Sequence, residues 1–339
     1  EVVLLEPAGG WSLTNLIQEQ GNEVIQEFEK HFPRILPHFY DAKNPQVDHD
    51  LLGADLVIVH EWNEPNLVEL LGKKKKEFGY RLFFHDTHHR AVTDPAAMEK
   101  FDLTHYDGVL AYGDVIRDMY LEKRWARKAW TWHEAADDSI FYPRQPPYKE
   151  GDLVWIGNWG DDERADMIDE FLIKPVTDMK LSATVYGVRY PANALDKLRK
   201  AGIRYGGYLP SVKVPEVFAK YRFTVHIPRK PYIRELPGIP TIRPFEAMAC
   251  GIPLISAPWG KAETIFSPGN DFILCENGEE MKKMIRPVLF SKPLRAQLIQ
   301  NGLTTISSGH LCSHRIDQLF RILNWLEAAD PIGELNVSP

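Results

Sequence analysis

Short apolar runs alternate with longer amphipathic segments along the whole chain. The runs in the first half predict strands at Val2–Leu5, Ala54–Glu61, Arg81–Asp86, Gly108–Gly113 and Lys128–Glu134. Those in the second half predict strands at Leu153–Asn158, Ala183–Gly187, Arg204–Tyr208, Phe223–Arg229, Pro253–Ala257 and Phe272–Glu276. The segments between them have helical spacing, as at Leu13–Gln20, Glu23–His31, Asn66–Glu77, Ala192–Ala201 and Glu279–Phe290. Strands alternating with helices are typical of parallel sheets with right-handed crossovers, so the sequence predicts an α/β fold with two such sheets.

The stretch Tyr142–Asp152, with the sequence YPRQPPYKEGD, separates the two halves. Its prolines and its glycine cannot continue a strand or a helix. A chain of 339 residues is also too long for one ordinary core. We therefore predict an N-terminal Rossmann-like domain at residues 1–145, a C-terminal one at 146–325 and a tail at 326–339.

Composition narrows the class of protein. Hydrophobic residues make up 44% of the chain and charged residues 26%, which is typical of a soluble globular protein. A net charge of −7 argues against a nucleic-acid partner. The cysteines Cys250, Cys275 and Cys312 form no CxxC pair, so we expect neither a disulfide framework nor a zinc site, and a cytoplasmic location. No apolar run is long enough to span a membrane, while the cationic run Lys73–Lys76 leaves a peripheral membrane contact open beside the favoured solvated helix end.

Polar residues and glycines cluster where the predicted strands end. In open parallel sheets, ligands bind outside the carboxyl ends of the strands. The first half has such residues at Gly9–Gly10, His60–Glu61, His85–Asp86 and His133–Glu134. The second half has them at Gly157–Asn158, Tyr208 and Arg229. We therefore expect the two sheets to face each other across a central cleft, with Arg229 adding positive charge or lying in a solvated turn.

The most informative segment is Pro237–Trp259, which predicts a loop, a short helix, a tight turn and a strand. Pro244 suits the first helical position, and Gly251 supplies the left-handed stop. The free N–H groups and the dipole at the start of this helix suit a diphosphate, and Arg243 is placed to bond a phosphate oxygen. Glu246, in the first turn, either accepts hydrogen bonds from a ribose diol or only complements the helix dipole.

The sequence RPFEAMACGIPLISAPW at Arg243–Trp259 resembles the donor-site signature of the group 1 glycosyltransferases with the GT-B fold, and most of all their CgeB-like branch. Two further segments also resemble that branch: GHLCSHRIDQLFRIL at Gly309–Leu323 and WHEAADDSIF at Trp132–Phe141. The resemblance covers residues 130–325 well and the N-terminal part less closely. It implies two Rossmann-like domains around a cleft, with the nucleotide-sugar donor bound by the second.

The resemblance also implies roles for single residues. Glu246 becomes the ribose-binding carboxylate, and diphosphate contacts come from Arg243 and the helix start at Pro244 and Phe245. Gly157 and Asn158 take the position of the loop that faces the diphosphate, and the backbone of Tyr208 and Leu209 that of the nucleobase contact. In the first domain, the loop Gly9–Gly10 would line the cleft near acceptor and donor. Gly238 stands where many relatives have a first glutamate, which leaves retention or inversion open.

The segment His85–Arg90, with the sequence HDTHHR, places three histidines, an aspartate and an arginine at the end of a predicted strand. A general base or acceptor contact is favoured there, beside the alternatives of structural hydrogen bonding and a metal site. If the enzyme inverts, we expect the base to be Asp86, His88 or His133. His60, Glu61 and Glu134 are candidate cleft or acceptor contacts, the first two equally well a buried structural pair. The DxD at Asp48–Asp50 precedes a strand and is interpreted as a coincidence at a helix start.

We conclude that the sequence predicts a glycosyltransferase that moves a sugar from a nucleotide-sugar donor to an acceptor of unknown class. Without metal or other cofactor, helix-end amides and Arg243 would stabilise the departing diphosphate. Two alternatives remain open. A nucleotide-sugar 2-epimerase shares this fold and donor site, and a non-catalytic nucleotide-sugar-binding module is compatible with the missing first glutamate.

Overall fold

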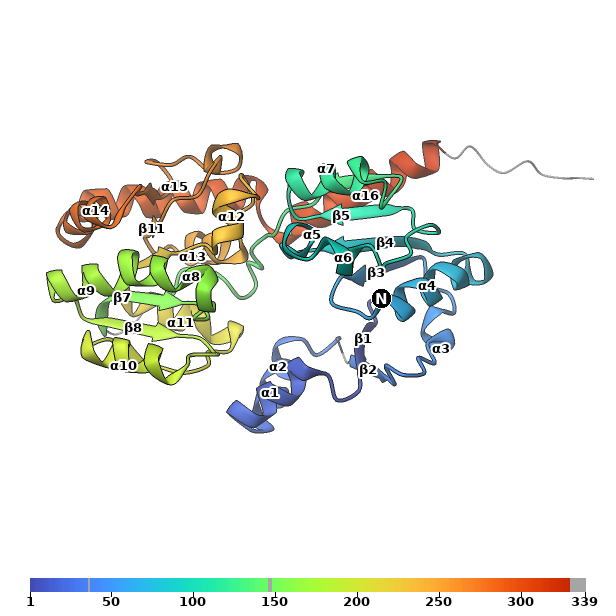
Figure 1. Cartoon of the computed structure of the whole chain (residues 1–339), viewed down its shortest axis with the longest axis horizontal. Coiled ribbons are helices and arrows are strands. Elements are labelled where there is room, and N and C mark those ends of the chain that lie inside the picture. The colour runs from blue at the N-terminus through green and yellow to red at the C-terminus, as the bar shows by residue number, and fades with distance from the viewer. Residues whose placement is uncertain (36, 146–147, 330–339) are drawn as a thin grey trace, which may run out of the picture. The chain divides into compact units, whose positions relative to one another are not determined.

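The computed structural model describes residues 1–35, 37–145 and 148–329. The chain divides into two compact units, the first made of residues 1–111 and 117–130, the second of residues 112–116 and 131–339 (Figure 1). Each unit has its own parallel sheet. None of the helices in the described ranges is long and apolar enough to cross a membrane.

The strands of the N-terminal half are β1 (Leu4–Pro7), β2 (Pro37–Tyr40), β3 (Leu56–His60), β4 (Arg81–Asp86), β5 (Gly108–Ala111) and β6 (Ala129–Thr131). The helices are α1 (Trp11–Gln20), α2 (Glu23–His31), α3 (Asp48–Leu51), α4 (Pro65–Phe78), α5 (Arg90–Thr93), α6 (Pro95–Met98) and α7 (Asp114–Glu122). The main sheet has the order β3-β4-β5-β6, and β3 and β4 run parallel with His60 opposite His85. This register brings the polar residues that follow the two strands to one edge of the sheet.

The prediction of two sheets needs a correction. In the described part of the chain, β1 and β2 form a separate two-stranded parallel sheet, with Leu4 opposite Pro37 and Pro7 opposite Tyr40. The strand β2 was not predicted, because its sequence PHFY is short, opens with a proline and has no clear alternation of apolar and polar residues.

The strands of the C-terminal half are β7 (Gly151–Ile156), β8 (Ala183–Tyr186), β9 (Arg204–Tyr205), β10 (Tyr221–His226), β11 (Leu254–Ser256) and β12 (Ile273–Leu274). They form a six-stranded sheet in the order β12-β11-β10-β7-β8-β9, and all neighbouring strands in it run parallel. This is the strand order of a doubly wound nucleotide-binding sheet. The order reverses between β7 and β10, and such a switch point is where these sheets bind ligands.

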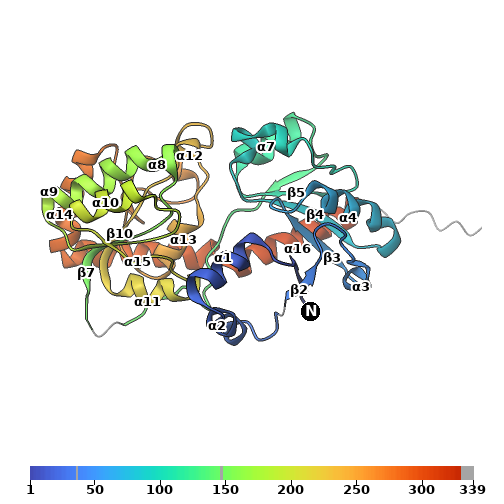
Figure 2. The same ribbon diagram turned by 60° about the horizontal axis from the view of Figure 1, so that its bottom comes forward.

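The helical segments of this half are α8 (Asp161–Ile168), η1 (Asp169–Ile173), α9 (Lys174–Met179), α10 (Ala192–Lys200), η2 (Ser211–Lys213), α11 (Val214–Ala219), α12 (Lys230–Arg234), α13 (Ile242–Ala249), η3 (Ala262–Thr264), α14 (Gly278–Phe290), α15 (Lys292–Gly309) and α16 (Cys312–Ala329). Figures 1 and 2 show helices on both faces of the sheet. The helix α16 continues to Ala329, so residues 326–329 of the predicted tail are helical, while 330–339 lie outside the described residues.

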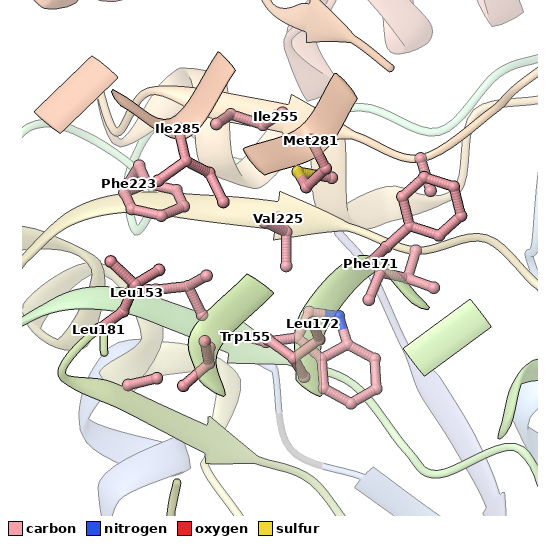
Figure 3. Close-up of a cluster of buried hydrophobic side chains, with 14 of the residues drawn as sticks. Leu153, Trp155, Phe171, Leu172, Leu181, Phe223, Val225, Ile255, Met281 and Ile285 are labelled. Carbon is pink, nitrogen blue, oxygen red and sulfur yellow. The ribbon is translucent and has the colours of Figure 1, made fainter. Parts of the chain in front are cut away.

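The core of the second unit explains why its strands are continuous apolar runs. Strand residues Leu153, Trp155 and Val225 pack against helix residues Phe171 and Met281, all of them buried (Figure 3). Because helices cover both faces of a parallel sheet, its strands do not alternate between apolar and polar residues. This core holds β7 and β10 in place, and the residues that follow these two strands therefore lie on a rigid base.

Candidate functional site

The turn after β7 is the predicted loop Gly157–Asn158. The N–H of Gly157 donates to the carbonyl of Tyr186 over 2.9 Å, and the side-chain oxygen of Asn158 accepts from the N–H of Val188 over 3.1 Å. Gly187 has a φ of +154°, and a Cβ there would lie 2.1 Å from the carbonyl oxygen of Gly157. Only glycine fits such an approach, so the ends of β7 and β8 are held backbone to backbone.

Arg164 lies on α8 beside this turn and was not among the predicted site residues. One terminal nitrogen of its guanidinium donates to the carbonyl of Asn158 over 3.1 Å, and the group lies 5.8 Å from the ring centroid of Trp155. Its Nε is buried without a hydrogen-bond partner in the described part of the chain. Burial and then the neighbouring charge of Arg229 lower the pKa of Arg164 to about 10. A partly buried cation whose Nε donor is left over is suited to an anionic ligand.

Arg229 follows β10, the strand next to β7 at the switch point. Its guanidinium forms an ion pair of 3.0 Å with Glu163, and Lys230 forms one of 3.1 Å with Asp166. The carboxylates of Glu163 and Asp166 come from α8, so two acidic side chains hold these cations beside the helix that carries Arg164. The predicted positive charge at Arg229 is thus present in the folded chain and partly balanced by Glu163.

The helix α13 begins at Ile242, so Pro244 is its third residue and not its first as predicted. The difference costs no hydrogen bond, because all of the first four N–H groups of a helix lack a partner within the helix. Thr241, in the N-cap position, makes no side-chain bond to the helix. Its hydroxyl lies 3.2 Å from Nε2 of His226 instead. The amides of Ile242 and Arg243 are therefore left without a side-chain cap.

His226, at the end of β10, fixes the direction of this bond. The Ser256 hydroxyl donates to the carbonyl of Ala257 over 2.8 Å, so it accepts from Nδ1–H of His226 over 2.9 Å. Nε2 is then the acceptor for the Thr241 hydroxyl. Burial, followed by the charges of Arg164 and Arg243, lowers the pKa of His226 to about 3, which keeps the ring neutral.

Glu246 and Arg243 form an ion pair within α13. Glu246 is only 6% exposed, and burial raises the pKa of its carboxyl while the Arg243 charge opposes the rise. The side chain of Phe245 is fully buried and lies 5.0 Å from the ring of Phe266, so only the backbone of Phe245 is placed to contact a ligand. Two of the predicted donor contacts, Arg243 and Glu246, are thus each other's partners.

The loop after β9 contains Tyr208 and Leu209, both half-buried. It is tied to the glycine turn, because Gly207 accepts a hydrogen bond of 2.8 Å from the N–H of Gly187. Tyr205 adds a second tie of 2.7 Å from its hydroxyl to the carbonyl of Gly187. The loops that follow β7, β8 and β9 therefore form one connected rim at the carboxyl ends of these strands.

The strand ends of the first unit bury two carboxyl groups. Glu61 and Asp86 are both 0% exposed. Asp86 accepts hydrogen bonds from the Tyr120 hydroxyl over 2.9 Å and from the N–H of His88 over 3.0 Å. Burial, followed by the charge of Glu61, raises the pKa of Asp86 to about 7. Asp86 thus has both oxygens bonded inside the protein, whereas His60 and His88 remain partly exposed.

The HDTHHR segment places its histidines in different surroundings. Burial, with the charge of His60, lowers the pKa of His85 to about 3, and the rings of His88 and His89 lie 4.0 Å apart. Among the residues that the structure describes, no three His, Cys, Asp or Glu side chains are grouped to hold a metal ion. Gly9 and Gly10 form the turn between β1 and α1, with Gly9 at a φ of +69°.

His133 and Glu134 follow β6 and belong to the second unit. Nδ1 of His133 lies 2.8 Å from the carbonyl oxygen of Tyr112. Arg315, on α16, donates to the carbonyl of His133 over 2.8 Å and to that of Glu134 over 3.3 Å. Arg315 belongs to the predicted C-terminal motif at Gly309–Leu323, and its contacts give that motif a structural role in holding the backbone of this segment.

Comparisons with known proteins agree with this architecture. Residues 164–321 match a family model described as glycosyl transferase-like. A structure of Anabaena HepE in complex with UDP is similar with a TM-score of 0.66 at 13% identity, covering 96% of this chain and 100% of that chain. Sucrose-phosphate synthase from Thermosynechococcus elongatus gives a TM-score of 0.60 at 14% identity, covering 81% and 74%. T4 phage β-glucosyltransferase gives 0.56 at 15% identity, covering 92% and 94%. No curated protein sequence matches the chain.

The chain therefore has the GT-B fold of glycosyltransferases, with two Rossmann-like domains built on parallel sheets, and the predicted fold class is confirmed. The matched region includes the switch-point residues Arg164, His226 and Arg243. Together the family match and the structural neighbours support a glycosyltransferase. Membership of the CgeB-like branch stays a prediction.

Proposed function

We propose that the chain is a glycosyltransferase of the CgeB-like branch that transfers a hexosyl or related group from a nucleoside diphosphate sugar to an acceptor, with the donor bound by the second unit. One observation carries this proposal: three arginines lie on the elements that meet at the switch point, beside the uncapped start of α13. Arg164 contacts the turn after β7, and Arg229 follows β10 and pairs with α8. Arg243 is in the first turn of α13, which is bonded to the end of β10 through Thr241 and His226. Cations and free amides that converge in this way bind a diphosphate. A uridine nucleotide is the first choice, because HepE has been described in complex with UDP and UDP-glucose.

Donor binding would rearrange the ion pair of α13. The diphosphate would compete with Glu246 for Arg243, and the carboxylate released from that pair would accept hydrogen bonds from the ribose hydroxyls. The burial of Glu246 supports this exchange, because a buried carboxylate without a partner is costly and gains from two new donors. The connected rim would position the rest of the nucleotide, with Gly157 and Asn158 beside the diphosphate and the backbone of Tyr208 and Leu209 on the base.

Charge stabilisation of the leaving diphosphate would come from the protein itself. Arg164, Arg229 and the amides of α13 are fixed before the donor arrives, so they would stabilise developing negative charge without reorganising. We propose that this set replaces a metal ion in the reaction. The candidate bases with partly exposed side chains are His88, in the first unit, and His133, in the second. The third candidate, Asp86, is buried and bonded to the backbone of His88.

Calorimetric titration with UDP in the presence of EDTA tests this proposal. Binding is expected in wild type, and Arg164→Met and Arg243→Met should each weaken it about 10- to 100-fold, since hydrogen bonds to charged groups contribute roughly 1.5–3 kcal/mol. The matched control is Arg199→Met, because Arg199 is exposed on α10 and pairs only with Asp196 among the described residues. Wild-type affinity in both site variants, or binding that requires a divalent cation, would contradict the proposed site.

A further inference from the structure

Trp62 is an exposed tryptophan in the loop that follows β3. Its side chain is 58% exposed, although it belongs to a residue type that is mostly buried in folded proteins. The neighbouring residues His60, Asn63 and Glu64 are polar and at least partly exposed. The ring is therefore an exposed apolar surface whose exposed neighbours along the chain are polar.

Two side chains hold the Trp62 ring in place. The guanidinium of Arg90 lies 4.4 Å from its centroid, and the ring of His88 meets it edge-on at a centroid distance of 4.8 Å. Arg90 is itself anchored, because it donates a hydrogen bond to the carbonyl of Glu61. A tryptophan fixed on two sides loses little side-chain entropy when a ligand stacks on it, so it is preorganised for binding.

Groups that can bond hydroxyls lie beside this ring. Nε2 of His60 is 3.0 Å from the Thr87 hydroxyl, and the Thr87 hydroxyl is 3.4 Å from Oε1 of the buried Glu61. Nδ1 of His60 is 2.9 Å from Oε2 of Glu61. Both ring nitrogens of His60 thus lie against protein groups, and the single hydroxyl proton of Thr87 is directed to Glu61. The partly exposed Thr87 oxygen keeps a lone pair that can accept a hydrogen bond from a ligand hydroxyl.

From this arrangement we infer that Trp62 and Thr87, with His60 positioning Thr87, bind a neutral sugar ring, which would make the acceptor a carbohydrate. A pyranose has a face of C–H groups that packs on an aromatic ring and an edge of hydroxyls for the polar neighbours. A lipid chain would need a wider apolar surface than one tryptophan. The role as acceptor rests on the proposed function, whereas sugar binding by this surface does not.

Saturation-transfer NMR on the full chain tests the inference with the methyl glycosides of glucose, galactose, mannose and N-acetylglucosamine as probes. At least one glycoside should receive saturation, strongest at its ring C–H protons, and Trp62→Ala should reduce the signal at least fivefold. Trp62→Phe should keep part of it, because an aromatic face remains. The control Trp325→Ala removes another exposed tryptophan, on α16, and should leave the signal unchanged.

A separate measurement distinguishes this inference from the proposed function. UDP affinity should be the same in Trp62→Ala as in wild type, and the glycoside signal should persist in Arg243→Met. No saturation of any of the four glycosides would overturn the inference, as would an equal loss of signal in Trp325→Ala. A Trp62-dependent signal from uridine as strong as that from the glycosides would also overturn it, since the surface would then select aromatic rings and not sugars.

Discussion

The hydroxyl of Thr241 lies 3.2 Å from Nε2 of His226, and this bond takes the N-cap side chain of α13 away from its own helix. A threonine in this position normally accepts a hydrogen bond from one of the first amides of the helix. Here the neutral His226 accepts from Thr241, and Ser256 determines which nitrogen is the acceptor. The start of α13 thus keeps its amides for a ligand.

Replacing His226 should weaken UDP binding through Thr241. In His226→Leu the Thr241 hydroxyl has lost its acceptor. The Thr241 oxygen would then cap α13 by accepting a hydrogen bond from the Arg243 amide, and it would compete with the diphosphate for that amide. We expect an approximately fivefold loss of UDP affinity by calorimetry, because a capping bond is worth about 1 kcal/mol. The double variant His226→Leu/Thr241→Ala should recover most of this loss.

The double variant separates this mechanism from simple damage to the fold. If His226 only supported packing, the second substitution would add to the first and affinity would fall further. Thermal unfolding of both variants provides the structural control. The added Thr241→Ala substitution removes the hydroxyl that lost its acceptor in His226→Leu, so the double variant leaves neither member of this hydrogen-bonded pair unpaired.

Gly187→Ala should destabilise the second unit and abolish UDP binding. The added Cβ would lie 2.1 Å from the carbonyl oxygen of Gly157, so the ends of β7 and β8 would have to separate. We expect a loss of about 2–4 kcal/mol in the free energy of unfolding, measured with denaturant. Gly202→Ala is the matched control: Gly202 also has a positive φ, of +71°, but no atom lies within 4 Å of its added Cβ. A loss near 1 kcal/mol is expected there, and equal losses in the two variants would contradict the steric explanation.

Much of this architecture could be predicted from sequence, because doubly wound sheets place their ligand-binding residues after the strands. Gly157, Asn158, Arg229 and Arg243 were all identified by their positions relative to predicted strands and to one helix start. The structure brings them to the switch point between β7 and β10, which the sequence pattern cannot locate because it does not give the order of strands in a sheet. The position along the chain was therefore predictable, and the spatial neighbours were not.

Three residues escaped prediction for separate physical reasons. Arg164 follows three acidic residues in a helix, a pattern typical of a solvated helix surface, and only its contact with Asn158 distinguishes it. His226 ends a buried strand, where a histidine is most often a structural residue. Trp62 was not singled out, since exposure of a single aromatic side chain depends on tertiary packing. In each case the missing information was the folded surroundings of the side chain, which the pattern of apolar and polar residues does not give.

Asp86 should make the stability of the first unit depend on pH. Its pKa is raised from 3.8 to about 7 in the folded chain, so the unfolded chain releases this proton at lower pH than the folded one. The contribution to stability is therefore full below about pH 4 and is lost as the pH rises toward 7, with a slope of at most about 1.4 kcal/mol per pH unit for one proton. Denaturant unfolding at pH 5 and pH 8 measures this loss.

Asp86→Asn is the variant that isolates this effect. The amide oxygen still accepts from either Tyr120 or His88, while the titrating carboxyl is removed. The difference in unfolding free energy between pH 5 and pH 8 should then be smaller in Asp86→Asn than in wild type. An identical difference in the two proteins would show that Asp86 is already ionised at pH 5 in the folded chain, contrary to its burial beside Glu61.

Glu246→Gln should separate the two halves of the donor site. The carboxylate is proposed to bind the ribose, so its loss should weaken UDP binding about tenfold by calorimetry, in keeping with the value of charged hydrogen bonds. Inorganic pyrophosphate has no ribose, and its affinity should be unchanged or higher because Arg243 no longer shares its charge with Glu246. Arg243→Met should weaken both ligands. If Glu246→Gln bound UDP as tightly as wild type, Glu246 would serve only to hold Arg243 and the start of α13.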